Sequence, residues 1–366
     1  MTLGLYVHLP FCRVHCTYCA FAISTELGRE DAYVEALIRE IEASGLGPRA
    51  SVDTAYFGGG TPSRTSLENL QRIAAALRDT FEIAPDAEFS LEANPEDLSR
   101  KALQGWRGLG VNRVSIGVQS FHDRELTPLG RIHGGRKARA AVALAVESGV
   151  RTNLDLILGL PEQTADSFLA TIDAAIELQA GHVSLYMLDL EPRSPLAVQI
   201  ERGRTSLPDD GLVADLYIEA VTRLESGGLH QYEISNFARE GEECRHNLRY
   251  WTRAEYHGFG LGAHSFRGER RFANTRDIRR YIETSPDAVD FSETIGSDEE
   301  RREILFLRLR QASGIDYEHV ARLCGQEGIS WMDRGLRDGW LRRMGERVAF
   351  TPSGFLLSNE YISQLF

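Results

Sequence analysis

The chain has 366 residues and a formal net charge of −12, with 42% hydrophobic and 26% charged residues, so it predicts one large domain with a smaller appendage. No run approaches the roughly 18 apolar residues of a membrane span, and the first residues lack a signal-peptide pattern, so we expect a cytoplasmic protein. The acidic balance disfavours a nucleic-acid partner. Arginines do gather in 268–280, and we interpret them as a solvated helix face with its loop.

Short apolar runs alternate with segments of helical periodicity over the first half of the chain. The helical segments include 31–44, 66–81 and 134–149, and the strand-like runs are 5–11, 54–60, 88–94, 113–120, 152–160 and 182–190. This alternation predicts βα units around a parallel sheet, and six units are too few for a closed eight-stranded barrel. We therefore expect an α/β fold with an incomplete (β/α)6 barrel.

The pattern changes after about residue 210. A helix near 209–227 precedes "HQYEISNFA", and a segment rich in glycine and aromatic residues, 244–266, is interpreted as a loop. From 297 onward, helices, a short strand, a turn and a closing helix indicate a small, mostly helical, winged-helix-like domain. The expected organisation is a barrel over 1–230, a connecting region over 231–296 and a C-terminal domain over 297–366.

Three of the five cysteines, Cys12, Cys16 and Cys19, directly follow the first predicted strand. In a protein that is not exported, such a cluster indicates metal or redox chemistry rather than disulfides. The spacing lacks the paired cysteines of most zinc sites, although His15 inside the loop keeps zinc as an alternative. Three thiolates can hold three corners of a [4Fe–4S] cubane and leave one iron open. Because active sites lie at the carboxyl ends of barrel strands, we predict a reactive cluster there.

Polar residues and glycines also mark the ends of the next predicted strands. They are Gly59 and Gly60 in "YFGGGTPS", Glu92 in "SLEANPE", Gln119 in "GVQSF" and Asp155 in "NLDLILGLP". Glycines allow the backbone to approach a ligand closely. A charge in an apolar strand is costly unless it is paired or used, so we interpret Asp155 as functional. Arg131, in a loop, is a candidate partner for Asp155 or for an anionic ligand.

The cysteine motif, with Tyr18 just before its last cysteine, resembles that of the radical S-adenosylmethionine (SAM) superfamily. The resemblance implies that the open iron binds SAM and passes it one electron, which cleaves SAM into methionine and a 5′-deoxyadenosyl radical. It also implies an electron donor for the cluster.

Further motifs resemble one branch of that superfamily, which contains oxygen-independent coproporphyrinogen III oxidase and the HemW-type heme chaperones. These motifs are "LYVHLPFC", "GGGTPS", "EANPE", "GVQSF", "DLILGLP" and "EISNFA". The resemblance implies that Tyr6 and Tyr18 flank SAM and that Glu92 meets its ribose. In the oxidase, a second SAM is held by the positions that match Gly59, Gly60, Thr61, Gln119, Arg131 and Asp155. Whether a second SAM binds here stays open.

Two features separate the chaperone from the oxidase. The oxidase has a long segment before its first strand and a fourth cysteine, where this chain begins its strand at residue 5 and has Phe21. The stretch "HNLRYW" resembles the H-N-x-x-Y-W motif of the chaperones. It makes His246, Asn247, Tyr250 and Trp251 the heme candidates, through an axial nitrogen and flat aromatic walls. The same residues could instead dock their segment onto the barrel.

The expected function is that of a heme chaperone, which binds heme as cargo and transfers it to acceptor proteins. The alternative is an enzyme, oxygen-independent coproporphyrinogen III oxidase. The resemblance implies SAM cleavage, while the two departures argue against this dehydrogenase activity. Cys244 is a competing heme ligand, and Cys324 is expected to be structural. Radical SAM modification of tRNA would need a basic surface and is disfavoured. A membrane-associated acceptor and a homodimer are both compatible with the sequence.

Overall fold

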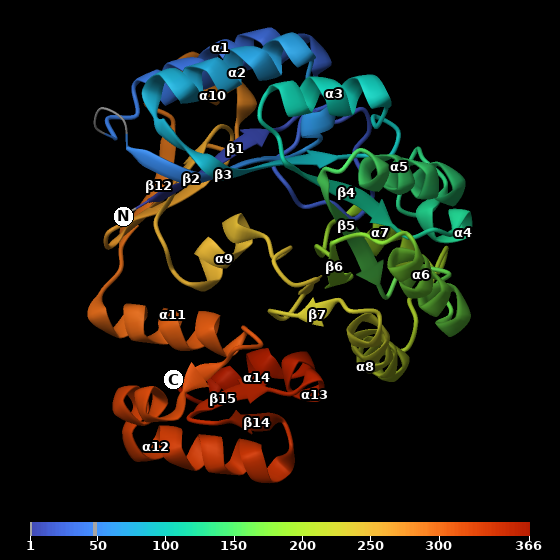
Figure 1. Cartoon of the computed structure of the whole chain (residues 1–366), viewed down its shortest axis with the longest axis vertical. Helices are drawn as coiled ribbons and strands as arrows, with labels where there is room; N and C mark the ends of the chain where they lie inside the picture. Colours follow the sequence, from blue (N-terminus) through green and yellow to red (C-terminus); the bar gives the residue numbers. More distant parts are fainter. Residues whose placement is uncertain (1, 47–49) are drawn as a thin grey trace.

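The described residues contain one twelve-stranded sheet whose outer side is covered by helices, and a small three-stranded sheet near the C-terminus (Figure 1). The computed structural model describes residues 2–46 and 50–366. The sheet order is β12-β11-β10-β9-β1-β2-β3-β4-β5-β6-β8-β7, and β1 to β6 run parallel to one another in chain order. This confirms the predicted α/β fold with six parallel βα strands in an incomplete barrel.

The six parallel strands start within six residues of their predicted positions. They are β1 (Leu3–Leu9), β2 (Ser51–Gly59), β3 (Glu82–Ala93), β4 (Arg113–Gln119), β5 (Arg151–Leu158) and β6 (His182–Met187). The helices of this part are α1 (Glu30–Glu42), α2 (Leu67–Thr80), α3 (Arg100–Gly108), α4 (Asp123–Leu126), α5 (Gly135–Glu147), α6 (Ala165–Glu177), α7 (Pro195–Glu201) and α8 (Asp210–Ser226), with short 3-10 turns at Leu27–Arg29 and Pro62–Arg64.

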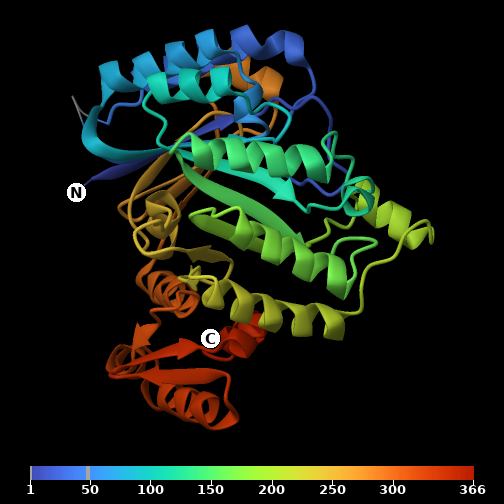
Figure 2. The ribbon, with the colours of Figure 1, turned by 45° about the vertical axis from the view of Figure 1, so that its right-hand side comes forward.

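Helices run along the outer side of the sheet (Figure 2), and the side chains buried between them and the strands belong to the main hydrophobic core. Residues of one strand face alternate sides, so in β1 the fully buried Leu5, Val7 and Leu9 face the helices. The other face of the strands points to the inside of the partial barrel. It carries polar side chains such as Glu92 and Asp155, so that face supplies the walls of a site.

The segment 244–266, expected to be a loop, is folded, and that prediction is wrong. It contains the helix α9 (Arg245–Trp251) and the strands β9 (Tyr256–Phe259) and β10 (His264–Arg267). β9 pairs in parallel with β1, so a strand from far along the chain extends the sheet beyond its N-terminal strand. The remaining strands of this region are β7 (His230–Gln231), β8 (Asn236–Ala238), β11 (Arg270–Asn274) and β12 (Val289–Thr294), with the helix α10 (Ile278–Thr284).

The C-terminal part is mostly helical and lies at one end of the molecule, drawn in orange and red in Figures 1 and 2. It comprises α11 (Ser297–Leu309), β13 (Ile315–Asp316), α12 (Tyr317–Asp338), β14 (Leu341–Met344), β15 (Arg347–Phe350), α13 (Pro352–Leu356) and α14 (Ser358–Ser363). Gly325 interrupts α12 with a φ of 60°, so this element is two helices in succession. The division at 230 and 296 stays a prediction.

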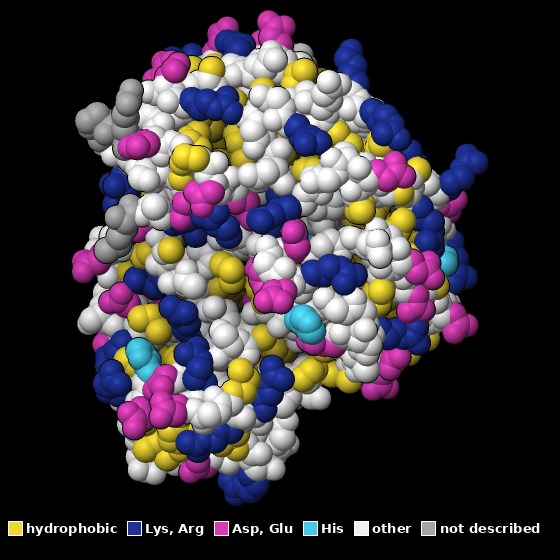
Figure 3. Space-filling model, in the orientation of Figure 1, with side chains coloured by type: hydrophobic (Ala, Val, Ile, Leu, Met, Phe, Trp, Pro, Cys, Tyr) yellow, Lys and Arg dark blue, Asp and Glu magenta, His cyan; other side chains and the backbone are white. Residues whose placement is uncertain are grey.

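Backbone hydrogen bonds attach this part to the hairpin of β7 and β8. The N–H of Ile234 donates to Arg310 O at 2.9 Å, and the N–H of Ala312 donates to Tyr232 O at 3.0 Å. Charges of both signs are interspersed over the face in Figure 3. In the described part of the chain, no helix combines the length and the apolar character needed to span a membrane.

Candidate active site: the cysteine loop and the cavity beneath it

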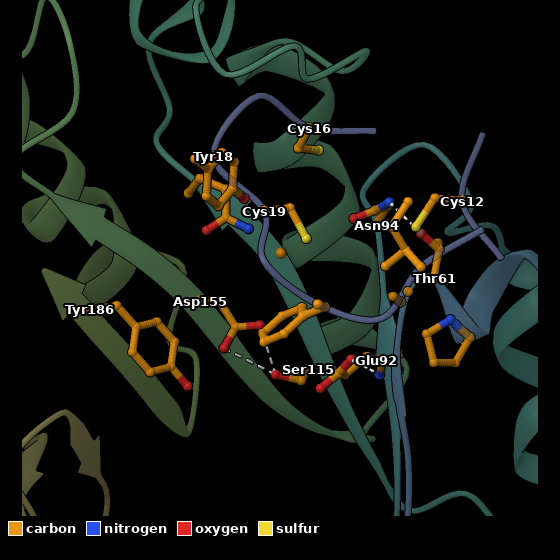
Figure 4. Close-up of a pocket in the computed structure, with 18 of the residues that line it drawn as sticks. Cys12, Cys16, Tyr18, Cys19, Thr61, Glu92, Asn94, Ser115, Asp155 and Tyr186 are labelled. Atoms are coloured by element: carbon orange, nitrogen blue, oxygen red, sulfur yellow. Dashed lines mark hydrogen bonds between the residues drawn. The ribbon is translucent and has the colours of Figure 1, made fainter. Parts of the chain in front are cut away.

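A cavity of about 580 Å³ lies on the inner side of the partial barrel, at the carboxyl ends of β1 to β6 (Figure 4). The loop with Cys12, Cys16 and Cys19 borders it on one side, and α9 borders it on another. The structure therefore brings together the predicted cysteines, Tyr6, Tyr18, Gly59, Gly60, Thr61, Glu92, Gln119, Arg131, Asp155, His246, Asn247 and Tyr250. Trp251 belongs to α9 and does not line this cavity.

The cysteine loop is anchored to the barrel at several points. The N–H of Cys12 donates to Ser24 O at 3.0 Å, and that of Ser24 returns a bond to Pro10 O at 2.8 Å. Thr17 donates from its N–H to Leu129 O at 3.1 Å and from Oγ1 to Pro128 O at 2.8 Å. These bonds fix both the start and the middle of the loop over the cavity.

Two hydrogen-bond donors point at the cysteine sulfurs. Thr61 Oγ1 lies 3.3 Å from Cys12 Sγ, and Arg131 Nη1 lies 3.8 Å from Cys16 Sγ. Burial raises the pKa of the Cys12 thiol to about 11 and also raises the pKa of Cys19. Thiolates in this loop therefore need a cation to compensate their charge, which bound iron provides.

The zinc alternative would need His15 as a ligand beside the three cysteines. Among residues 2–46 and 50–366, no three side chains of His, Cys, Asp and Glu are arranged to hold one metal ion. His15 instead points Nε2 at Cys19 O, 3.2 Å away. In a cubane each thiolate binds a different iron, so three cysteines spaced along one loop are compatible with a cluster.

Gly59 and Gly60 lie where a side chain would collide with neighbouring atoms. A Cβ on Gly60 would lie 2.5 Å from Pro10 O and 3.0 Å from Cys12 Sγ. Gly59 has a φ of 116°, and a Cβ there would lie 2.6 Å from the His8 ring. Gly60 therefore lets the end of β2 lie directly against the start of the cysteine loop, and Gly59 lets it lie against the His8 ring of β1.

Glu92, at the end of β3, is held by two donors in the cavity wall. Tyr56 Oη donates to Oε1 at 2.9 Å, and the N–H of Gly59 donates to Oε2 at 2.9 Å. Burial, and next the negative charge of Asp155, raise the pKa of Glu92 to about 7 despite these bonds. A cationic ligand in the cavity would stabilise the ionised form, so the site favours a cation.

Asp155 is held in a polar network on neighbouring strands. Ser115 Oγ donates to its two oxygens at 3.2 and 3.0 Å, and Asn153 Nδ2 donates to Oδ1 at 3.0 Å. Burial raises the pKa of Asp155. Arg131 does not pair with Asp155. Its Nη2 donates to Gly117 O at 2.7 Å and to Asn94 Oδ1 at 2.6 Å.

The remaining predicted SAM residues have distinct surroundings. Gln119 ends β4 with a φ of 63°, a strained conformation for a residue with a side chain. Tyr6 Oη lies 3.0 Å from His8 Nδ1, and its ring stacks on that of Tyr56. Tyr18 packs on a small apolar cluster that includes Leu129 and Leu196.

His246 is buried, and both of its ring nitrogens have partners. Nδ1 lies 3.0 Å from Thr54 Oγ1, and Nε2 lies 2.9 Å from Tyr250 Oη. Its ring also stacks on Tyr56, and burial lowers its pKa to about 3. The histidine therefore docks α9 into the barrel as a neutral side chain. Ligation of heme iron by His246 stays a prediction, and it would require one of these bonds to break.

Glu88 holds the start of α9 from inside the sheet. Its carboxylate accepts hydrogen bonds from Cys244 Sγ at 3.4 Å and from the N–H groups of Arg245 and His246 at 3.2 and 3.0 Å. A buried ion pair with Arg113 Nε at 3.0 Å balances its charge. Burial raises the pKa of Cys244 to about 12, so its thiol stays neutral. Cys324, in α12, lies outside this site.

Several cavity residues were not among the predicted ones. Tyr56 binds Glu92, Ser115 and Asn153 bind Asp155, and Asn94 binds Arg131. The period of two in a strand places Asn153 on the same face as Asp155, so the alternation in "NLDLIL" is a signal for that residue. Tyr186 and Met187, at the end of β6, also line the cavity.

The chain matches a family model described as the Radical SAM superfamily over residues 6–175. It is 38% identical to heme chaperone HemW of Mycobacterium tuberculosis strain H37Rv, over 99% of this chain and 94% of that protein. Heme chaperone HemW of Bacillus subtilis strain 168 is 34% identical, over 97% of each chain.

Among solved structures, coproporphyrinogen III oxidase (HemN) from Escherichia coli, described as a radical SAM enzyme, superposes with a TM-score of 0.87. That alignment covers 100% of this chain and 90% of the other, at 25% identity. The similarity at 34–38% identity over nearly whole chains is to heme chaperones. This chain therefore belongs to the HemW-type heme chaperone family of the radical SAM superfamily.

Proposed function

We propose that this protein binds heme and passes it to acceptor proteins, with a [4Fe–4S] cluster and SAM in the cavity beneath the cysteine loop. The observation that carries the proposal is the match, over 99% of the chain, to a protein named as a heme chaperone. The cysteine loop at the carboxyl ends of the strands supports the cofactor part. The heme acceptors and the electron donor are proposed partners, identified only by these roles.

Cys12, Cys16 and Cys19 are the proposed cluster ligands. When bound, the cluster supplies one-electron chemistry to SAM. Thr61 and Arg131 donate to two of the cysteine sulfurs, and such bonds lower the basicity of a thiolate ligand. Gly59 and Gly60 keep the neighbouring backbone within reach of a ligand at this loop.

Glu92 and Asp155 are the proposed residues that attract SAM. Both carboxyl groups lie in the cavity wall with raised pKa values, and SAM carries a sulfonium charge that offsets theirs. Tyr56 and Gly59 hold the Glu92 oxygens in place, and Ser115 and Asn153 hold those of Asp155. The wall is therefore ordered before the ligand arrives.

The alternative function is oxidation of coproporphyrinogen III. The similarity of the whole fold to HemN favours it. Phe21, two residues after Cys19, is the departure that argues against it.

Titration of the anaerobically reconstituted protein with heme tests the proposal. We expect saturation at about one heme per chain, followed by difference absorbance in the Soret region. The iron and sulfide content measured before the titration confirms that the cluster is present. Absence of saturable heme binding by protein with a full cluster would contradict the proposed function.

A further inference from the structure

The mouth of the cavity has an apolar rim formed by Val14, Phe21, Ile132, Tyr186 and Met187. All five side chains line the cavity, and each is between 40% and 69% exposed. Phe21 has the largest exposed fraction of any large hydrophobic side chain in the described residues. Exposed apolar groups gathered around one opening are typical of a binding surface rather than of ordinary solvent-facing positions.

The rim comes from three separate parts of the chain. Val14, between Cys12 and Cys16, and Phe21, after Cys19, belong to the cysteine loop. Ile132 follows Arg131, and Tyr186 and Met187 end β6. Figure 4 shows Tyr186 on the side of the cavity away from Cys12 and Thr61. The rim therefore lies on both sides of the opening, which suits a flat ligand that spans it.

We propose that heme binds across this rim, with its macrocycle on the apolar side chains, rather than at His246. This inference rests on the proposed function, since it locates the same cargo. His246 is 1% exposed and has both ring nitrogens bound to Thr54 and Tyr250. Heme iron could bond to His246 only if one of these two hydrogen bonds broke. Binding at the rim breaks no such bond, because the rim side chains are already exposed.

The rim also offers the donor atoms that heme iron takes. His15 is exposed on the cysteine loop, and Met187 is exposed at the end of β6. An imidazole nitrogen and a thioether sulfur are both axial ligands of heme iron in proteins. Both residues line the cavity, so an iron held over the mouth can take its ligand from either side.

A cation beside the cysteine loop and acids beyond β6 favour one orientation of the propionates. Arg13 is exposed on the cysteine loop and pairs with Asp97 at 2.9 Å, and Arg276 is exposed and donates to Ala20 O at 2.8 Å. On the opposite side, Asp189 and Glu191 are exposed beyond β6. Asp97 already neutralises Arg13, so Arg276, beside the loop residue Ala20, is the cation that can attract the carboxylates of heme, while Asp189 and Glu191 repel them from the β6 side.

The test compares heme affinity in protein with its cluster reconstituted. Removing two apolar rim contacts in Phe21→Ser/Met187→Ser is expected to raise the Kd for heme by about tenfold or more. The matched control is Phe291→Ser/Met344→Ser, which removes a phenylalanine and a methionine that are 43% and 39% exposed elsewhere. The control is expected to bind heme like the wild type.

The outcomes separate this inference from the proposed function. Wild-type affinity in the rim variant would overturn the rim as the heme site and leave the chaperone function standing. No heme binding by the wild type would overturn both. If Phe21→Ser disturbs the iron content, Tyr186→Ser/Met187→Ser changes only the β6 side and decides the question in the same way.

The axial ligand and the orientation have their own readouts. His15→Ala or Met187→Ala is expected to shift the Soret maximum of the bound heme, whereas His246→Ala is expected to leave it unchanged. Arg276→Ala is expected to weaken binding of heme but not of its dimethyl ester. A Soret shift in His246→Ala alone would instead assign the iron to α9 and contradict the inference.

Discussion

At the scale of single residues, the cysteine loop has the features that a cluster needs. Three half-buried thiols border one cavity, donors point at two of the sulfurs, and glycines leave room beside them. Cys324 lies elsewhere, in α12, and serves as the comparison. The loop therefore allows a test that changes one sulfur at a time.

Cys16→Ala is expected to remove most of the iron and sulfide from reconstituted protein, together with its absorbance at about 400 nm. The reason is that one cluster ligand is lost. Cys324→Ala is the control, since that half-buried thiol lies in α12 outside the site. Chemical iron and sulfide analysis measures both variants. Equal iron in the two variants would contradict the assignment of the cluster to this loop.

Glu92 predicts how SAM binding depends on pH. Its raised pKa of about 7 means that the carboxyl group loses its proton as the pH rises through neutrality. The ionised form attracts the cationic ligand, so the Kd for SAM should fall as the pH rises through about 7. Equilibrium dialysis of SAM at several pH values measures this.

The variant Glu92→Gln cannot ionise, so its Kd for SAM should be larger and should change less with pH. The amino group of SAM also changes its protonation with pH. Because it does so with both proteins, comparing them removes its contribution to the pH dependence of Kd. A wild-type protein with the same pH dependence as Glu92→Gln would show that another group attracts the ligand.

The sequence predicted the residues at strand ends better than their partners. Glu92 and Asp155 stand out because a charge next to an apolar strand is unusual. Tyr56 and Ser115 do not stand out, because tyrosine and serine are common in strands and their roles depend on which strands become neighbours. The register of β2 against β3 decides the contact of Tyr56, and that of β4 against β5 decides the contact of Ser115; neither register is visible in the local pattern.

At the scale of elements, α9 shows why a folded segment was predicted to be a loop. The helix has only seven residues, too short to be stable alone. Glu88, on β3, binds its first N–H groups across more than 150 residues of sequence. Such a helix forms because of the sheet around it, and its own periodicity gives little signal.

Glu88→Gln tests the importance of this anchor. The change leaves Arg113 buried without its counter-charge, and breaking a buried ion pair costs about 3–5 kcal/mol. We expect the free energy of unfolding to fall by about that amount, as measured by urea denaturation. Glu147→Gln, which breaks an exposed pair with Arg100, is the control and should cost less than about 1 kcal/mol. Equal losses in the two variants would contradict a buried anchor for α9.

At the scale of the whole molecule, the alternation of strands and helices was sufficient to predict the incomplete barrel. The six parallel strands each bury an apolar face under a following helix, so local periodicity and fold agree. The extension of the sheet by β7 to β12 was not predicted. These strands have two to six residues, and β9 joins the sheet through pairing with β1.

The barrel, the cavity and the family membership together support a radical SAM protein that handles heme. The oxidase and the chaperone share this fold, so the fold does not separate them. Full-length identity to heme chaperones and Phe21 after the third cysteine favour the chaperone. The two functions can therefore be compared by offering heme and coproporphyrinogen III separately to the same reconstituted protein.

Two parallel assays on anaerobically reconstituted protein with SAM and a reductant distinguish a heme chaperone from an oxidase. One assay supplies coproporphyrinogen III and measures protoporphyrinogen, and the other supplies heme and measures binding stoichiometry. The chaperone account predicts no product and about one heme bound per chain. Product formed with multiple turnovers would contradict it and would identify the protein as an oxidase.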